Sequence, residues 1–256
     1  MSGLEILSIP VLNDNYVHLI HDSESGATAC VDPAIAPPVI QAAKAKGWSI
    51  SHILITHPHG DHTDGVGGIV AAFGAEVYGS RADQGQIPKC GHGVGQGDRI
   101  AVGVASCEVF DVPGHTAHHV AYYFQDAEAL FPGDTLFSLG CGRLFGGTAT
   151  QMWDSLKKLR SLPGQTLVYC AHEYTNANAD FALSVDPDNA DLQARADQVV
   201  NLREAGKPTV PSVLENEVRC NPFLRCDIPA FQAAVGMAGQ DASHVFTELR
   251  RQKDHF

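Results

Sequence analysis

A short apolar run that ends in a cluster of ligand-forming side chains constrains the fold of this chain more than any other feature. The run ILIT at residues 53–56 is followed at once by HPHGDHTD at 57–64. The apolar run is typical of a buried strand. Because rigid sheets commonly present functional side chains on the loops that follow their strands, this stretch predicts a sheet with a metal site at its edge.

Composition limits the partners that such a chain can have. The 256 residues carry a formal net charge of −12, which argues against binding nucleic acid or an anionic membrane through the overall field. The first residues, MSGLEILSIP, have no basic segment followed by a long apolar one, and no apolar run approaches 18 residues. The seven cysteines contain no C-x-x-C pair, which favours reduced thiols. We therefore expect a cytoplasmic protein that contacts neither nucleic acid nor a membrane. A monomeric state and a small-molecule partner are further expectations, which do not follow from composition.

The order of predicted elements indicates a layered α/β fold. Helical patterns cover 36–47, 66–74 and 149–162. Short strand-like runs surround them, at 16–20, 28–32, 52–56, 76–79, 107–112, 119–124, 129–134 and 166–171. Strands and helices alternate without strict βαβ repetition, which favours a sandwich. Beyond residue 174 the helical patterns at 189–206 and 241–256 predict a small, mainly helical domain, so the expected domains are 1–174 and 175–256.

The glycine-rich segment CGHGVGQGDRI at 90–100 is a second motif that requires interpretation. No clear strand precedes it, no helix follows it, and no Lys-Ser/Thr ends it, so it fails the context of a phosphate-binding loop. Turns that lead into a hairpin are the better interpretation.

The histidine motif has the spacing of two adjacent metal sites. His57 and His59 point to the same side of an extended backbone, because side chains alternate there, so both can reach one ion. The neighbouring residues Asp61 and His62 face a second position more easily. An isolated histidine is usually structural, but H-x-H-x-D-H directly after a buried strand favours ligation.

Three further strand ends carry ligand-type residues, namely His115, Asp134 and His172. A coordination count assigns His57, His59 and His115 to a first ion. It assigns Asp61, His62 and His172 to a second, with Asp134 as the bridge. Such a donor set suits two divalent ions, with zinc expected first and iron or manganese as alternatives. Two ions about 3.5 to 4 Å apart hold a hydroxide nucleophile and polarise a carbonyl, which predicts a hydrolase.

The motifs THPHGDH, GHT, GDT and CAHEY resemble those of the metallo-β-lactamase superfamily. Within it the chain is similar to the glyoxalase II (hydroxyacylglutathione hydrolase) family, on NDNY, VDP, GDTLFSLGCGR, HEYT, NPFLR and the terminal LRRQKDHF. The similarity covers essentially the whole chain. It implies an αββα sandwich with a helical C-terminal domain that binds glutathione. The implied reaction is the hydrolysis of S-D-lactoylglutathione to D-lactate and glutathione, the second step of methylglyoxal detoxification.

The resemblance also implies roles for individual residues. It gives the same seven metal ligands, and it points to Arg143, Tyr174, Arg250 and Lys253 as contacts of the glutathione thioester. Asp61 is a candidate to accept the proton of the hydroxide, and Asp134 is expected to serve both ions. Phe145 stands where the family often has a tyrosine, which removes one possible hydroxyl contact to the substrate. His118 replaces a usual glycine.

Other functions remain compatible with the sequence. A lactonase, a β-lactamase or a persulfide dioxygenase would share the sandwich and the histidines, although the dioxygenase uses one iron. A nuclease of the same superfamily would need a basic groove, which the acidic composition disfavours. A metal-binding module without catalytic activity is an alternative from a different class.

Overall fold

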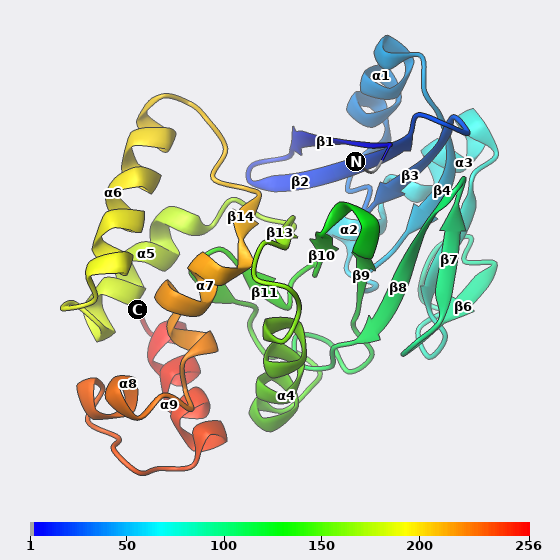
Figure 1. The fold of residues 1–256 in the computed structure, drawn as a ribbon. Helices are drawn as coiled ribbons and strands as arrows, with labels where there is room; N and C mark the ends of the chain where they lie inside the picture. Colours follow the sequence, from blue (N-terminus) through cyan, green and yellow to red (C-terminus); the bar gives the residue numbers. More distant parts are fainter. Residues whose placement is uncertain (1–2) are drawn as a thin grey trace. The chain divides into compact units, whose positions relative to one another are not determined.

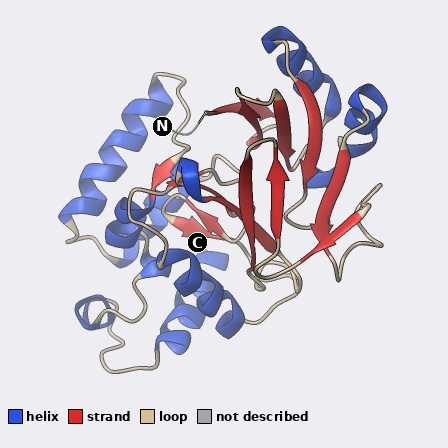
Figure 2. Cartoon of the chain, turned by 45° about the vertical axis from the view of Figure 1, so that its right-hand side comes forward, coloured by secondary structure: helices blue, strands red, loops and turns tan. Residues whose placement is uncertain are grey.

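The computed structural model describes residues 3–256 and divides the chain into two compact units (Figure 1). The first unit contains the chain up to Asp111 together with His118–Gly133. The second unit contains Val112–Ala117 and Asp134–Phe256. Figure 2 shows that strands and helices both contribute large parts of the chain. Within residues 3–256 no helix combines the length and the apolar character needed to cross a bilayer.

The first sheet lies wholly within the first unit and has its six strands in chain order. These strands are β1 (Leu4–Val11), β2 (Asn15–Asp22), β3 (Ala27–Val31), β4 (Ser49–Leu54), β5 (Glu76–Ser80) and β6 (His92–Val94). The pairs β1–β2 and β2–β3 are antiparallel, whereas β3 to β6 are parallel. Parallel strands have their carboxyl ends at one edge of a sheet, so the residues that follow β3 and β4 come together there.

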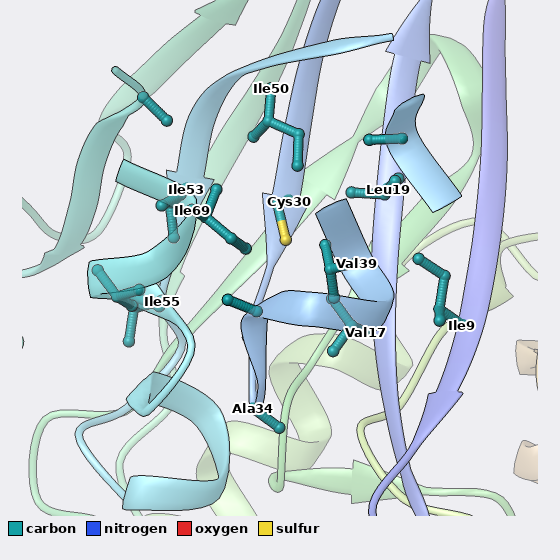
Figure 3. Packing of buried hydrophobic residues seen from close by; sticks show 14 of the residues in the cluster. Ile9, Val17, Leu19, Cys30, Ala34, Val39, Ile50, Ile53, Ile55 and Ile69 are labelled. Atoms are coloured by element: carbon teal, nitrogen blue, oxygen red, sulfur yellow. The ribbon is translucent and has the colours of Figure 1, made fainter. Parts of the chain in front are cut away.

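Two helices, α1 (Ala36–Lys46) and α3 (Val66–Phe73), supply the connections between parallel strands and cover one face of this sheet (Figure 1). Figure 3 shows Val39 and Ile69 from these helices packed with Leu19, Cys30 and Ile53 of the strands. The helices approach each other closely, since a Cβ on Gly68 would lie 2.5 Å from the Cβ of Ala36. A short helix, α2 (Gly60–Thr63), precedes α3.

An antiparallel group of strands completes the first unit. It consists of β7 (Arg99–Val102), β8 (Ala105–Asp111), β9 (Val120–Phe124) and β10 (Ala129–Phe131), with the 3-10 turn η1 (Gln125–Ala127) between the last two. Every residue of β9 is buried. Tyr122 on β9 donates a hydrogen bond of 2.7 Å to the carbonyl of Ile55, just beyond β4. His18 on β2 packs against Phe131 on β10, with ring centroids 5.5 Å apart. Side chains from both groups of strands therefore share the interior of this unit.

The second unit is mainly helical. Its helices are α4 (Ala149–Arg160), α5 (Thr175–Val185), α6 (Ala190–Glu204), α7 (Leu214–Cys220), α8 (Pro229–Ala234) and α9 (Ala242–Asp254), with the 3-10 turn η2 (Pro222–Leu224). Its strands are short: β11 (Leu136–Phe137) pairs with β12 (Gly140–Cys141), and β13 (Leu167–Val168) pairs with β14 (Ser212–Val213). Phe246 on α9 packs against Trp153 on α4 and against Phe223 in η2, so these aromatic rings join α9 to both elements.

Several elements differ from those expected from the sequence. The strand expected at 52–56 is β4 at Ser49–Leu54, and the run at 166–171 forms only the two-residue β13. Part of the glycine-rich segment becomes β6 in the first sheet, whereas the chain after it enters the hairpin β7–β8. The helices α5, α7 and α8 lack a strong apolar pattern and were not predicted individually. The two compact units are not the expected domains 1–174 and 175–256. The domain boundary at residue 174 stays a prediction.

Candidate metal centre

The first unit gathers four of the predicted ligands around the turn from β4 into α2. His57 and His62 are almost completely buried, and His59 is the residue directly before α2. Asp32, which follows β3, is buried beside them. Its backbone has φ 48°, a left-handed conformation that Asp tolerates better than most residues. Asp32, His57 and His62 form a group whose nearest ligand atoms lie within 4.8 Å of one another.

His57 and His59 bring one ring nitrogen each close together. Nε2 of His57 lies 2.9 Å from Nδ1 of His59. Nδ1 of His57 lies 3.0 Å from the hydroxyl of Thr56, which fixes the orientation of the ring. Two nitrogen ligands at about 2.0–2.1 Å from one tetrahedral ion are about 3.3 Å apart, so a small adjustment would let both rings bind the same ion.

Asp61 and His62 form a second pair. Nε2 of His62 lies 3.6 Å from Oδ2 of Asp61. On the other side of the ring, Nδ1 of His62 lies 2.9 Å from Oδ2 of Asp32. A carboxylate at Nδ1 favours the tautomer that carries its proton there and leaves Nε2 available to a metal. The amide of Asn15 donates to both the carbonyl and Oδ2 of Asp61, each at 3.2 Å, and so orients that carboxylate.

The second unit contains the other three predicted ligands, and they meet at Asp134. Oδ2 of Asp134 lies 3.4 Å from Nε2 of His115, and Oδ1 lies 3.4 Å from Nε2 of His172. Nδ1 of His115 donates to the carbonyl of Arg143 at 2.8 Å, which again leaves Nε2 available. His172 stacks on Tyr174 with ring centroids 4.7 Å apart. Each oxygen of Asp134 thus faces a different histidine.

The chemistry of these donors fits divalent metal ions. Each unit contains buried imidazoles together with carboxylates, and His62 and His115 each have Nδ1 engaged by an acceptor while Nε2 faces a carboxylate. This arrangement is the usual environment of a histidine that ligates zinc or iron. The assignment of individual ligands to individual ions remains a prediction.

The residues expected to contact the substrate all lie in the second unit, in different surroundings. Arg250 is buried and donates to the carbonyl of Cys141 and to Asp254, each at 2.9 Å. Lys253 is half-buried and donates to the carbonyl of Ala177 at 2.7 Å, and burial lowers the pKa of its ammonium group to about 8.

Three more of these residues lie near the ligands of the same unit. The side chain of Arg143 is mostly exposed, with Nε 4.0 Å from Asp254. Phe145 is 67% exposed and packs edge-on against His115, with ring centroids 5.3 Å apart. Tyr174 is partly exposed beside His172. Arg143, Phe145 and Tyr174 are therefore accessible from solvent, in contrast to Arg250.

The residues that orient the predicted ligands, such as Asp32 and Asn15, were harder to find from the sequence. Neither Asp32 nor Asn15 was expected among the site residues, although VDP and NDNY both belong to the motifs that carry the resemblance. Their partners lie 24 to 46 positions away in the chain. His119 is buried and stacks on His57 with ring centroids 4.7 Å apart, whereas His118 is exposed.

Comparison with known proteins identifies the class of this fold and site. Residues 15–172 match the family model described as the metallo-beta-lactamase superfamily, and residues 173–256 match the model described as hydroxyacylglutathione hydrolase C-terminus. Among solved structures, a BLEG-1 B3 metallo-beta-lactamase aligns with a TM-score of 0.68 at 22% identity, covering 86% of this chain and 99% of the other. The chain therefore belongs to the metallo-β-lactamase superfamily, and the predicted sandwich fold is confirmed.

Curated relatives place the chain more narrowly. A hydroxyacylglutathione hydrolase of Rhodospirillum rubrum is 54% identical over 256 residues, which is 100% of both chains. The hydroxyacylglutathione hydrolase of Methylococcus capsulatus is 53% identical and covers 99% of each. Within the superfamily, this chain is a member of the hydroxyacylglutathione hydrolase family, as the resemblance predicted. A solved structure at 25% identity, TTHA1623, is described in a di-iron-bound form; its TM-score is 0.61, and the match covers 86% of this chain and all of the other.

Proposed function

We propose that this chain hydrolyses S-D-lactoylglutathione to D-lactate and glutathione, as the second step of methylglyoxal detoxification. The observation that carries the proposal is the 54% identity, over the full length of both chains, to a protein named hydroxyacylglutathione hydrolase. The two groups of imidazole and carboxylate donors would hold the divalent ions that supply the chemistry of such a hydrolysis.

The proposed cofactor is a pair of divalent metal ions. His57, His59 and His115 would hold one ion. Asp61, His62 and His172 would hold the other, and Asp134 would bridge the two. The contacts described inside each unit support this division, because His57 pairs with His59, Asp61 pairs with His62, and Asp134 turns one oxygen to each of its histidines. Zinc is the first expectation, and the di-iron form of TTHA1623 supports iron as the alternative.

The residues of this chain have separate tasks in the proposed mechanism. Paired divalent ions supply a nucleophile at neutral pH by lowering the pKa of water, and they polarise the carbonyl under attack. Asp61 would accept the proton that the nucleophile loses, and its two hydrogen bonds from Asn15 support this role by orienting it. The departing thiol has an unperturbed pKa near 8.5, so it can leave as a thiolate without a dedicated acid. No serine or cysteine nucleophile is required.

We assign recognition of glutathione to residues 175–256 together with Arg143, Phe145 and Tyr174. Glutathione carries two carboxylates, which cationic side chains bind through charge-assisted hydrogen bonds. Arg143 and Lys253 are the cations best suited to this task, because both are at least partly accessible. Phe145 offers only apolar contact. Arg250 is the remaining predicted contact. It is buried, and it donates to the carbonyl of Cys141.

The decisive experiment measures the rate of hydrolysis by purified protein of known metal content. We expect S-D-lactoylglutathione to be hydrolysed much faster than a simple lactone or a β-lactam, at about two metal ions per chain. A preference for the lactone or the β-lactam would assign the chain to another activity of its superfamily. Full metal occupancy without turnover of any thioester would favour a metal-binding module instead.

A further inference from the structure

One loop of the second unit links two predicted ligands, Asp134 and His115, in addition to the direct contact between their side chains. This ligand loop, residues 134–143, begins at Asp134 and ends at Arg143, whose carbonyl accepts the hydrogen bond from Nδ1 of His115. The two ends of the loop touch, because a Cβ on Gly142 would lie 2.0 Å from the carbonyl oxygen of Asp134. The conformation of this one loop therefore sets both the bridging carboxylate and the orientation of His115.

The turn at the far end of the ligand loop is unfavourable by itself. Ser138 and Leu139 join β11 to β12 as a two-residue turn, since Phe137 pairs with Gly140. Leu139 has φ 58°, a left-handed conformation that usually requires glycine or asparagine. The Leu139 side chain is buried with Ala179, Ala182 and other residues of α5 and α6. Contacts outside the turn must therefore keep the backbone in this conformation.

Glu217 on α7 supplies the most direct of these contacts. Its carboxylate is buried and accepts a hydrogen bond of 2.7 Å from the backbone N–H of Leu139 and one of 2.9 Å from the hydroxyl of Ser138. Burial raises the pKa of Glu217, whereas these donors stabilise its ionised form. A buried carboxylate is costly unless donors surround it, so the turn and Glu217 stabilise each other.

Side chains from three other positions hold the rest of the loop. The amide of Asn221, at the end of α7, donates to the carbonyls of Phe137 and Gly140 at 3.2 and 3.0 Å, one on each strand of the hairpin. Asn178 on α5 donates to the carbonyl of Ser138 at 3.0 Å. Arg250 on α9 donates to the carbonyl of Cys141 at 2.9 Å. The ligand loop is thus bonded to helices α5, α7 and α9.

We propose that Glu217 and Asn221 are positioning residues for metal binding, which act by holding the ligand loop and with it Asp134 and the carbonyl that orients His115. This inference rests on the proposed metal site. It assigns to α7 a role in metal affinity in addition to the role of the C-terminal helices in substrate recognition. Neither residue is a ligand, and both are buried, so their effect passes through the loop backbone.

The test measures the affinity of each protein for zinc by competition with a chromophoric chelator, using the whole chain. The variants are Glu217→Gln, which keeps the size of the side chain but removes the charge, and Asn221→Asp, which keeps the acceptor for Phe223 N–H but removes the donor to the loop. Loss of a partner that orients a ligand typically weakens metal binding about 10- to 100-fold. We expect a change of this size in both variants, with activity restored by excess zinc.

Asp186→Asn is the matched control, because Asp186 is another buried carboxylate of the second unit and is bonded to Asn189 and Arg225. It should lower the melting temperature and leave zinc affinity unchanged. Zinc affinity equal to that of the parent protein in folded Glu217→Gln and Asn221→Asp would overturn the inference, and so would an equal loss in Asp186→Asn. Failure of the parent protein itself to bind zinc or hydrolyse the thioester would instead contradict the proposed function.

Discussion

The replacement Asp32→Asn tests how the first unit prepares His62 for metal binding. Asp32 accepts three hydrogen bonds: Oδ1 accepts from the N–H of Thr56 at 2.8 Å, and Oδ2 accepts from the hydroxyl of Thr56 at 2.7 Å and from Nδ1 of His62 at 2.9 Å. Asparagine has nearly the same size and tolerates the left-handed backbone at this position equally well. The substitution therefore changes hydrogen bonding with little added strain.

Neither orientation of the asparagine amide can satisfy all of these partners. With its oxygen toward the N–H of Thr56, its NH₂ group faces His62, which must then accept at Nδ1 and carry its proton on Nε2. With the opposite orientation, the NH₂ group faces the buried N–H of Thr56, and two donors oppose each other. A hydrogen bond to a charged group contributes about 1.5–3 kcal/mol. For a chain of this size we expect the melting temperature of the metal-free protein to fall by roughly 3–12 °C.

Metal affinity should fall as well, since the nitrogen that would bind the ion becomes protonated in one of the two orientations. We expect a loss of about 10- to 100-fold, measured by chelator competition on the folded protein. Asp22→Asn is the control, because Asp22 is also buried in the first unit and accepts from the N–H groups of Val104 and Glu24. The reasoning is refuted if Asp32→Asn binds metal as tightly as the parent protein, or if Asp22→Asn loses affinity to the same extent.

Three further predictions concern the proposed reaction. Asp134→Asn should reduce turnover and metal content more than His59→Ala does, because each oxygen of Asp134 faces a different histidine; near-normal turnover with two metals per chain would exclude the bridge. Lys253→Met should raise KM for the glutathione thioester roughly 10-fold. In the parent protein KM should rise above about pH 8, where the Lys253 ammonium loses its proton, and a thioester without the glutathione carboxylates should show neither effect. A chelator should abolish turnover, whereas alkylation of the cysteines should leave it largely intact. Burial raises the pKa of thiols such as Cys170 and Cys141 and keeps them unreactive. The opposite pattern would indicate a thiol nucleophile.

The local sequence already determined where the ligand-type residues stand. His57, His59, Asp61 and His62 follow a buried strand in an unbroken motif, and such a pattern can be recognised without any distant contact. The helices α1, α4 and α9 were also predictable, because their apolar residues recur with helical spacing and glycine or charged residues end them.

Short elements and strand ends were less predictable, because they depend on partners elsewhere in the chain. The apolar run HILIT continues to Thr56, yet β4 ends at Leu54. Beyond it, Thr56 bonds through its N–H and its hydroxyl to Asp32, a residue 24 positions earlier. Helix α7 has no strong apolar pattern of its own. Its contacts are with distant segments. Glu217 on α7, for example, accepts a hydrogen bond from Leu139, which lies 78 positions earlier.

The tertiary structure alone decided which buried polar groups orient the ligands. From the sequence, Arg250 in the last helix is expected to contact the glutathione thioester. The structure buries its side chain and bonds it to the carbonyl of Cys141, 109 positions away. The sequence likewise gives no sign that Asn15 donates a hydrogen bond to Asp61 or that Glu217 accepts one from the loop that starts at Asp134. Hydrogen bonds of this kind form only when packing has removed water and brought distant segments together. A single sequence therefore reveals the ligands through local spacing, whereas the residues that orient them emerge only from the folded chain.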